Sequence, residues 1–479
     1  MTPRLEVLSR DEIYDIHLAT LNVLEETGVR MLDPKALHML SDAGANVDLK
    51  TSLVRIPEHL LKDGIRKAPS RFTLYGRDAN YKLRFQRGRT YFSSQGTSIF
   101  VLDFETGIRR KATIKDLKSF YILTDALENI DHASLVVWPS DVPENVAHAY
   151  ALLEGFRNTT KTLDTYNYGE RMTMDGIEMA RIIAGGEEEL RKSPRLLGFV
   201  NPVSPLEHSK EMTEGLRVLA EHKQPTLIAP EAQAGSTAPV TLAGLLVQQN
   251  AEVLSGILVS EVTQPGAPVL YGTVSCITDM RTGNIALGAI ETGLINIATA
   301  QIAEYYGLPS RGTGGVTNSK TPDIQAGFEK GLTLYMAAMA GINFIYDAAG
   351  LLEASRTASL EQMVIDNDLC GMVQRALHGI QVDEGTMAGE VISQVGPGRH
   401  YLSHKHTQEF FRSEHYLPKI LDRGSWEIWE KAGSRELRSI AHETARKILD
   451  EHTVEPLDKT IDSELEDWVK KIGERRTPS

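Results

Sequence analysis

The chain has 479 residues, of which 41% are hydrophobic, so it can form one large domain or up to three smaller ones and is too apolar to be disordered. Its 51 Lys and Arg residues against 64 Asp and Glu give a formal net charge of −13, which argues against a nucleic-acid-binding surface, since phosphates must be neutralised by basic residues. The only cysteines, Cys276 and Cys370, exclude a disulfide framework and any four-cysteine metal site.

The sequence shows no pattern typical of secretion or of a membrane span. No apolar stretch follows Arg4 near the N-terminus, as a secretory signal would require. The most apolar window, 286–303, is interrupted by Glu291 and is therefore expected to be a buried helix. We expect a cytoplasmic protein without a membrane partner.

Residues 1–90 are predicted to form an α+β appendage. Apolar residues recur at helical spacing over 11–27, with Ser9 or Asp11 as N-cap and Gly28 after the helix end. The remaining predicted elements of this part are a short helix at 34–43 and strands at 54–56, 72–74 and 83–85.

Residues 91–378 alternate short apolar runs with helix-length amphipathic stretches. The predicted strands are 91–94, 133–138, 161–166, 196–201, 226–231, 269–273, 309–314 and 342–346. Eight strand–helix units favour the α/β class and a (β/α)8 TIM barrel. A doubly wound sheet is the alternative, but no Gly-x-Gly-x-x-Gly follows the first strand, as its dinucleotide-binding version would require.

Residues 379–479 form the third predicted part. The stretch up to about residue 402 is rich in glycine and is expected to be loop with a short helix. Helices are predicted at 425–433, 434–452 and 463–472, and we expect them to pack on the barrel as a helical extension.

The carboxyl ends of the predicted strands carry several aromatic residues. In a TIM barrel the loops that form the active site converge at this end. The rings are Trp138, Tyr166, Tyr168, Tyr271 and Tyr346. Together they predict a box for a quaternary ammonium, which has no N–H to donate and binds ring faces through its charge. The alternative is that the rings cap the barrel core.

Two charged residues also lie at strand ends. Glu231 is predicted to be a counter-ion or a base, unless it only caps a loop. Arg311 is predicted to hold a substrate carboxylate through paired hydrogen bonds. The alternative for Arg311 is an ion pair with a barrel acid such as Asp347 or Glu353, and a helical pair is considered for Glu353 and Arg356.

Other candidate chemistry has less support. The histidines His400, His404 and His406 lack an established metal-ligand spacing, so no metal is predicted, and a solvated loop or a surface that meets a partner is preferred. Cys276 follows a strand end but is more typical of a buried thiol than of a nucleophile. No Gly-x-Ser-x-Gly elbow occurs near a strand end.

Motifs in a fixed order over about 400 residues make the chain resemble the trimethylamine methyltransferase family, specifically its members without pyrrolysine that act on quaternary amines such as betaines. They are the segment 16–29, then 55–57, 68–69, 74–78, Asn201-Pro-Val-Ser-Pro205, 319–330, Gly341-Ile-Asn343-Phe-Ile345-Tyr346, Asp366-Asn-Asp368, 395–398 and His406-Thr407.

The resemblance implies a (β/α)8 barrel that moves a methyl group from an amine nitrogen to the cobalt of a separate corrinoid protein. Cobalamin would thus be supplied by a partner, with no cofactor held tightly by this chain. The sequence contains no pyrrolysine. We expect the loop at 314–320 to correspond to the position at which other family members carry pyrrolysine. The absence of pyrrolysine argues against trimethylamine as the substrate and leaves glycine betaine, proline betaine and carnitine as candidates. The resemblance also implies a role in a process such as methanogenesis. Gly398, His400, His404 and His406 are expected to contact the partner, and a homo-oligomer is expected at this size.

Attack of Co(I) on a methyl of a quaternary amine is an in-line displacement that releases a neutral tertiary amine. No proton moves, so no catalytic acid or base residue is predicted, and positioning supplies the rate enhancement. Three alternatives remain at this stage. One is a barrel lyase or aldolase using Lys320 or Glu231, another is a quaternary-ammonium-binding protein without catalysis, and the third is methyl transfer to tetrahydrofolate or a thiol.

Overall fold

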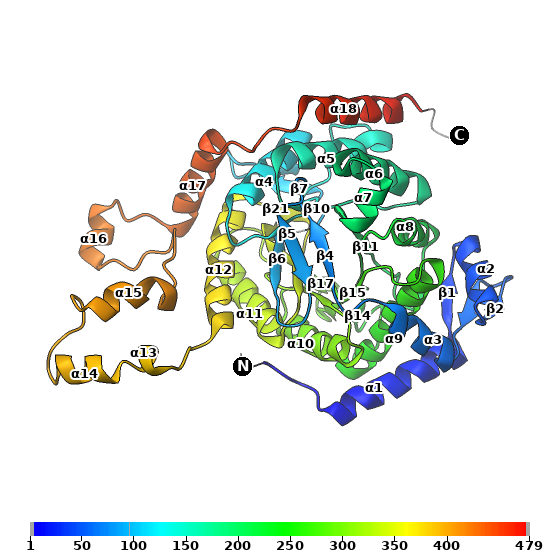
Figure 1. Ribbon diagram of the computed structural model, residues 1–479, viewed down its shortest axis with the longest axis horizontal. Helices are drawn as coiled ribbons and strands as arrows, with labels where there is room; N and C mark the ends of the chain where they lie inside the picture. Colours follow the sequence, from blue (N-terminus) through cyan, green and yellow to red (C-terminus); the bar gives the residue numbers. More distant parts are fainter. Residues whose placement is uncertain (1–3, 95, 476–479) are drawn as a thin grey trace.

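The structure, a computed structural model, describes residues 4–94 and 96–475. Its centre is a closed barrel in which eight parallel strands follow the order β10-β11-β13-β15-β18-β19-β6-β9 (Figure 1). These strands are β6 (Tyr91–Ser94), β9 (His132–Ala133), β10 (Thr162–Asp164), β11 (Leu196–Val200), β13 (Thr226–Ile228), β15 (Val269–Gly272), β18 (Ser310–Thr313) and β19 (Phe344–Ala349). Each overlaps one predicted run, so the TIM-barrel class is confirmed.

Helices surround the barrel, one after each strand (Figure 1). They are α4 (Ile114–Ala126), α5 (Glu144–Asn158), α6 (Glu170–Ala184) with α7 (Glu187–Lys192), α8 (Lys210–Glu221), α9 (Leu242–Thr263), α10 (Ile290–Tyr305), α11 (Ile324–Ala340) and α12 (Leu360–His378). Of the described helices, only α9 is long and apolar enough to cross a membrane. Most of α9 is buried against α1, α3, α8 and the barrel, which accounts for its composition.

The N-terminal part joins the barrel through a shared sheet. Its elements are α1 (Arg10–Asn22), a π-helical turn (Val23–Thr27), β1 (Val29–Met31), α2 (Pro34–Asp42), β2 (Asn46–Asp48), β3 (Leu53–Arg55) and α3 (Glu58–Lys67). Ser9 caps α1 as predicted, because its hydroxyl accepts from the Glu12 N–H while the Glu12 carboxylate accepts from the Ser9 N–H. Strand β1 pairs in parallel with β12 (Glu207–His208), which lies in a barrel loop.

A hairpin fills the amino end of the barrel. Strands β4 (Phe72–Tyr75) and β5 (Lys82–Phe85) lie in the centre of Figure 1 and pack Leu74, Leu83 and Phe85 against inward-facing barrel residues. The Phe85 ring meets the Phe344 ring edge to face, with 5.5 Å between centroids. Burial of each such ring contributes about 1.5–3 kcal/mol, which fixes the hairpin in place. The carboxyl end therefore remains as the place for a binding cavity.

Loops beyond the strands build small sheets over the carboxyl end. One joins β7 (Phe100–Leu102) and β8 (Arg109–Lys111) to β20 (Leu351–Leu352) and β21 (Thr357–Ala358), and another contains β14 (Gln233–Ala234), β16 (Cys276–Thr278) and β17 (Ile285–Ala286). The turn between β20 and β21 contradicts the expected helical pair of Glu353 with Arg356, because Glu353 instead accepts two hydrogen bonds from Arg109.

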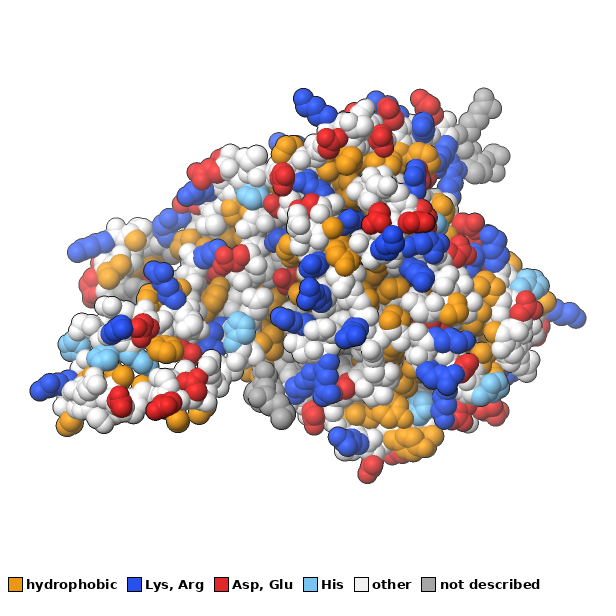
Figure 2. Space-filling model, viewed as in Figure 1, with side chains coloured by type: hydrophobic (Ala, Val, Ile, Leu, Met, Phe, Trp, Pro, Cys, Tyr) orange, Lys and Arg blue, Asp and Glu red, His pale blue; other side chains and the backbone are white. Residues whose placement is uncertain are grey.

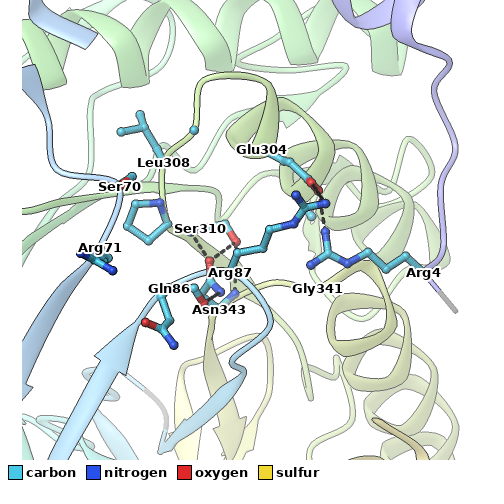
Figure 3. Close-up of a pocket in the computed structure, with 13 residues that line it drawn as sticks. Arg4, Ser70, Arg71, Gln86, Arg87, Glu304, Leu308, Ser310, Gly341 and Asn343 are labelled. Atoms are coloured by element: carbon cyan, nitrogen blue, oxygen red, sulfur yellow. Dashed lines mark hydrogen bonds and ion pairs between the residues drawn. The ribbon is translucent and has the colours of Figure 1, made fainter. Parts of the chain in front are cut away.

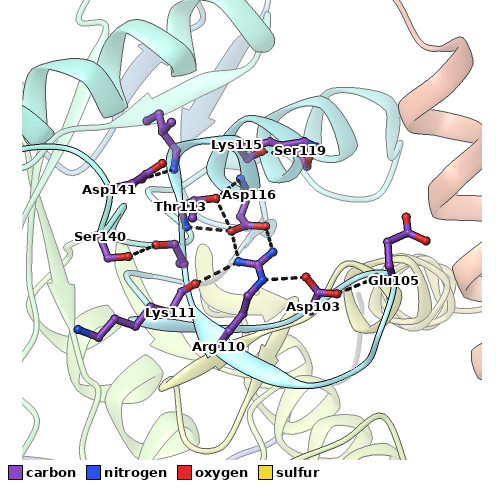
Figure 4. Close-up of polar contacts among 12 residues, drawn as sticks. Asp103, Glu105, Arg110, Lys111, Thr113, Lys115, Asp116, Ser119, Ser140 and Asp141 are labelled. Carbon is purple, nitrogen blue, oxygen red and sulfur yellow. Dashed lines mark hydrogen bonds and ion pairs between the residues drawn. The ribbon is translucent and has the colours of Figure 1, made fainter.

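An arginine fastens the first of these sheets to the helix that follows it. Arg110 donates to Asp103 and to both carboxylate oxygens of Asp116, at 2.7–2.9 Å (Figure 4). Asp116 also accepts from the N–H and hydroxyl of Thr113, the N-cap of α4. Charge-assisted bonds of this kind hold the wall of the barrel mouth in one conformation.

The C-terminal part begins with an arm of small helices and ends with two helices packed on the barrel. The arm, residues 380–431, contains α13 (Glu384–Met387), α14 (Gly389–Val395), α15 (Lys405–Glu414) and α16 (Trp426–Lys431), and it lies outside the ring of helices, beside α12 (Figure 1). Helix α17 (Leu437–Glu451) packs on α12 and α4, and α18 (Lys459–Glu474) packs on α5 and α6.

Candidate active site

A cavity of about 230 Å³ lies at the carboxyl end of the barrel. Residues at or just beyond the ends of six barrel strands line it. They are Gly96, Thr97, Phe199, Asn201, Leu227, Glu231, Val274, Arg311, Tyr346, Asp347 and Ser355. Of the predicted substrate-binding residues, the structure brings Glu231, Arg311 and Tyr346 together here. Gln95, another residue at a predicted strand end, lies outside the described residues.

Arg311 extends from β18 into the floor of the cavity and is almost fully buried. Its Nη1 donates to the carbonyl oxygen of Thr273 and, at 2.6 Å, to the hydroxyl of Thr313. Its Nη2 lies 3.5 Å from Oδ2 of Asp347. The ion pair with a barrel acid, considered as the alternative for Arg311, is therefore present. The predicted grip on a substrate carboxylate is not supported, because neighbouring strands already occupy Nη1.

Asp347 completes this pair from the end of β19. Its backbone adopts φ of +70°, a left-handed conformation that Asp tolerates better than most residues. Oδ1 accepts a hydrogen bond from the N–H of Gly96 at 3.0 Å, which ties β19 to the loop after β6. Burial raises the pKa of Asp347 and the neighbouring Arg311 charge lowers it, so the pair forms a compensated unit in the floor.

Glu231 is the acid of the cavity that has no hydrogen-bond or ion-pair partner among the described residues. It follows β13, and its side chain is exposed to the cavity while protein surrounds it on the other sides. No hydrogen bond or ion pair joins Glu231 to another described residue. Its surroundings raise the pKa of Glu231, first by loss of solvent and then by repulsion from Asp347, while Arg311 opposes the rise. The cavity thus contains a carboxylate ready to bind a cation.

A second, deeper acid supports the floor from below. The Tyr346 hydroxyl donates to Oδ2 of Asp164 at 2.6 Å, and Oδ1 of Asp164 accepts from the Leu135 N–H at 2.8 Å. Burial raises the pKa of Asp164 to about 7. Because Asp164 holds its hydroxyl, the Tyr346 ring is fixed in the cavity, with the Arg311 guanidinium 4.9 Å from the ring centroid.

The other predicted rings do not form one box with Tyr346. Trp138 and Tyr166 are 4.8 Å apart between centroids and Tyr168 is 6.1 Å from Tyr166, so these three rings form a row. Trp138 and Tyr166 pack partly against the core between the barrel and α4–α5, and none of the three lines the cavity. The expectation that all five rings share one cavity is therefore wrong.

Tyr271 faces away from the barrel interior. Its ring is fully buried among residues of α9 and α10, and its hydroxyl donates to Oδ1 of Asn250 on α9 at 2.8 Å. Within β15 the alternation of side chains turns Leu270 inward and Tyr271 outward. The assignment of Tyr271 to the substrate-binding site is thus corrected to a role in packing.

The alternative nucleophiles lie elsewhere. Lys320 lines a separate cavity of about 810 Å³ with Glu329 and Glu353, and its ammonium donates to the carbonyl oxygen of Asn318. No lysine lines the 230 Å³ cavity. Cys276 is buried in β16, where loss of solvent raises the pKa of its thiol to about 12, so little thiolate is present at neutral pH.

The predicted partner-contact residues Gly398, His400, His404 and His406 lie on the arm, and Figure 2 shows histidines in pale blue on that part of the surface. His406 reaches the carbonyl oxygen of Gly385 at 3.3 Å within the same arm. None of these residues lines the cavity, and their contact with a partner stays a prediction. Among residues 4–94 and 96–475, no three His, Cys, Asp or Glu side chains gather as a metal site would require.

A further cavity lies at the opposite, amino end of the barrel (Figure 3). Its volume is about 430 Å³, and Arg4 and Arg87 both pair there with Glu304. Asn343 accepts from the Ser310 N–H at 2.9 Å and closes the floor. TIM-barrel chemistry takes place at the carboxyl end, so the cavity with Glu231 is the candidate active site.

The sequence did not single out Asp164 or Phe199 as site residues, and it named Asp347 only as an alternative ion-pair partner of Arg311. Asp347 follows directly on Tyr346 at a predicted strand end, and Asp164 is a charged residue inside an apolar strand, so both carried a usable signal. Phe199 carried none, because an apolar residue in a buried strand is ordinary core.

Comparisons with known proteins give the family and agree with the fold. The sequence model of the trimethylamine methyltransferase family (MTTB) matches residues 1–476. A glycine betaine methyltransferase of Desulfitobacterium hafniense is 34% identical over 99% of this chain and 99% of its own length. Trimethylamine methyltransferase MttB of Methanosarcina barkeri is 37% identical over 98% and 95%. The solved structure of the hydroxylamine complex of MtmB, at 13% identity, shares the fold with a TM-score of 0.55, over 94% of this chain and 90% of its own.

Proposed function

Because the chain belongs to the trimethylamine methyltransferase family, we propose that it transfers a methyl group from a quaternary amine to the Co(I) of a separate corrinoid protein. The observation that carries the proposal is the unpartnered carboxylate of Glu231 in a cavity at the carboxyl end of the barrel. A permanent cation is the ligand that such a carboxylate attracts most strongly.

The residues of the cavity are suited to positioning. In the proposed step the C–N bond breaks, its electron pair stays on nitrogen, and the methyl carbon forms a bond to cobalt, which changes from Co(I) to Co(III). No proton is transferred, so no acid–base pair is needed. Glu231 would orient the ammonium, and the Arg311–Asp347 pair together with Tyr346 would provide a fixed floor against which the substrate rests.

Differential stabilisation sets a limit on the role of Glu231. The positive charge of the nitrogen decreases as the C–N bond breaks, so a carboxylate in direct contact with it would stabilise the ground state more than the transition state. Glu231 at the exposed side of the cavity supplies affinity without full enclosure of the charge.

Two features favour a quaternary amine over trimethylamine and over lyase chemistry. The sequence contains standard residues only, whereas the resemblance connects trimethylamine with pyrrolysine. A Schiff-base mechanism lacks its lysine, because Lys320 lines another cavity.

The test is a substrate screen. The purified chain, reduced corrinoid protein and a panel of N-methylated amines are combined, and formation of methyl-Co(III) is followed by absorbance. We expect a signal with at least one quaternary amine and none without the chain. Absence of transfer from every quaternary amine, with the corrinoid protein present, would refute the proposal, and binding without transfer would identify a binding protein.

A further inference from the structure

The charges of the cavity point to a narrower class of substrate. We infer that the cavity takes a quaternary amine of net positive charge, with a neutral tail such as a hydroxyl or alkyl group, in preference to a zwitterion that carries its own carboxylate. This inference rests on the proposed function, because it concerns the substrate of the same site.

The side chains that line the cavity carry a net negative charge. Among the described residues that line the cavity, the charged side chains are Glu231, Arg311 and Asp347. Arg311 and Asp347 compensate each other at 3.5 Å, and both are buried. Glu231 is left as one negative charge that no described residue pairs with. A ligand with one net positive charge therefore makes the site neutral, whereas a zwitterion leaves it negative.

Arg311 is the only positive charge among these lining residues, and its terminal nitrogens are already engaged by the protein. Its Nη1 is bonded to Thr273 and Thr313, and its Nη2 faces Asp347. Its Nε has no partner but is shielded from solvent, so it does not present a free donor to a ligand. A substrate carboxylate would have to displace Asp347 to form the paired hydrogen bonds that an arginine offers.

The acids of the cavity would repel a carboxylate on the substrate. A zwitterion small enough for a cavity of about 230 Å³ would place its carboxylate within several ångströms of Glu231 or Asp347. Two carboxylates about 8 Å apart, at an effective dielectric constant of about 20, repel each other enough to weaken binding about 30-fold. The same carboxylates attract a cation.

The Tyr346 ring is not the main group that binds the positive nitrogen. Tyr346 is only 7% exposed. Arg311 lies over its ring, and Gly96 packs so closely that an added Cβ would be 2.8 Å from the Cε1 atom of Tyr346. The face that an ammonium would need is therefore largely covered, and Glu231 is left as the group that binds the positive nitrogen.

Choline and glycine betaine provide a matched pair of probes, because they share the trimethylammonium group and differ in a hydroxymethyl against a carboxylate. We expect isothermal titration calorimetry with the full chain to show choline binding at least about tenfold more tightly than glycine betaine. Glu231→Gln should weaken choline binding about tenfold or more and should reduce the difference between the two ligands. Glu188→Gln, a change of the same charge at a surface site, should leave both affinities as they are.

The outcomes separate this inference from the proposed function. Tighter binding of glycine betaine than of choline, or no measurable binding of either, would overturn the inference. Equal affinities in wild type and Glu231→Gln would overturn the role of Glu231. Since Glu231 makes no hydrogen bond with another described residue, the variant should melt as the wild type does, which a thermal scan verifies. Choline binding together with no methyl transfer to the corrinoid protein from any quaternary amine of the panel would support the inference and refute the proposed function.

Discussion

Asp164→Asn is expected to stabilise the protein, and to do so more strongly as pH rises. Asp164 is buried beneath the cavity, where loss of solvent raises its pKa from 3.8 to about 7 despite hydrogen bonds from Tyr346 and Leu135. In the unfolded chain the carboxyl group ionises near its ordinary pKa. Between about pH 4 and pH 7 the folded protein therefore binds more protons at this site than the unfolded chain does.

This difference in bound protons determines whether the free energy of unfolding rises or falls with pH. Stability falls with rising pH wherever the folded state binds more protons, so Asp164 lowers the free energy of unfolding progressively from about pH 4 to about pH 7. A difference of about 3 pH units corresponds to about 4 kcal/mol, fully present above pH 7. An asparagine does not ionise, and its amide can donate to the Tyr346 oxygen while its carbonyl accepts from Leu135.

Urea unfolding followed by circular dichroism at pH 5 and pH 8 measures the effect. We expect Asp164→Asn to exceed the wild type in free energy of unfolding by about 1–2 kcal/mol at pH 5 and by up to about 4 kcal/mol at pH 8. Asp467→Asn, which changes an acid that is 62% exposed, is the matched control. The reasoning would be refuted by a stability difference that is the same at both pH values or by an Asn variant that is less stable at pH 8.

Four further outcomes are expected. Choline affinity should fall as pH is lowered, because protonation of Glu231, whose pKa is raised, removes the attracting charge; calorimetry that shows a flat profile from pH 8 down to pH 4 would speak against this. Gly315→Ala should destabilise by more than about 1 kcal/mol, since φ is +75° and the new Cβ would lie 2.6 Å from a carbonyl oxygen of β19. Gly327→Ala on α11, with open space around it, should instead stabilise the protein by about 0.5–1 kcal/mol. The midpoints of urea unfolding measure the stability of both glycine variants. Lys330→Met should cost about 3–5 kcal/mol because Asp366 remains buried without its cation, and adding Asp366→Asn should recover part of the loss; equal stability of the single and double variants would contradict this.

The barrel could be predicted from the sequence because its strands are short apolar runs at regular intervals. A parallel strand is buried on both faces, so it is written as a continuous apolar run that is easy to find. Because both faces of such a strand are buried, its sequence does not show which side chains point into the barrel. All four residues of β15 are buried, and no polar alternation shows that Tyr271 turns toward α9 while Leu270 turns inward.

The hydrogen-bond and ion-pair partners that neighbouring strands supply could not be predicted from the sequence either. The position of Arg311 at a strand end was predictable, but its acceptors Thr273 and Asp347 are 38 and 36 residues away along the chain. Only the closed strand order brings them next to one another. Glu231 was predicted to be a counter-ion or a base, and the absence of a partner for it among the described residues is a property of the folded cavity that no local pattern records.

Transfer of a labelled methyl group tests the central claim most directly. Tetramethylammonium fully deuterated on its methyl groups is incubated with the chain and a reduced corrinoid protein, and the corrinoid is then analysed by mass spectrometry. The account predicts a trideuteromethyl group on cobalt with the wild type and, at low substrate concentration, much less with Glu231→Gln. It would be contradicted if the label stayed on the amine while the amine was bound in the cavity.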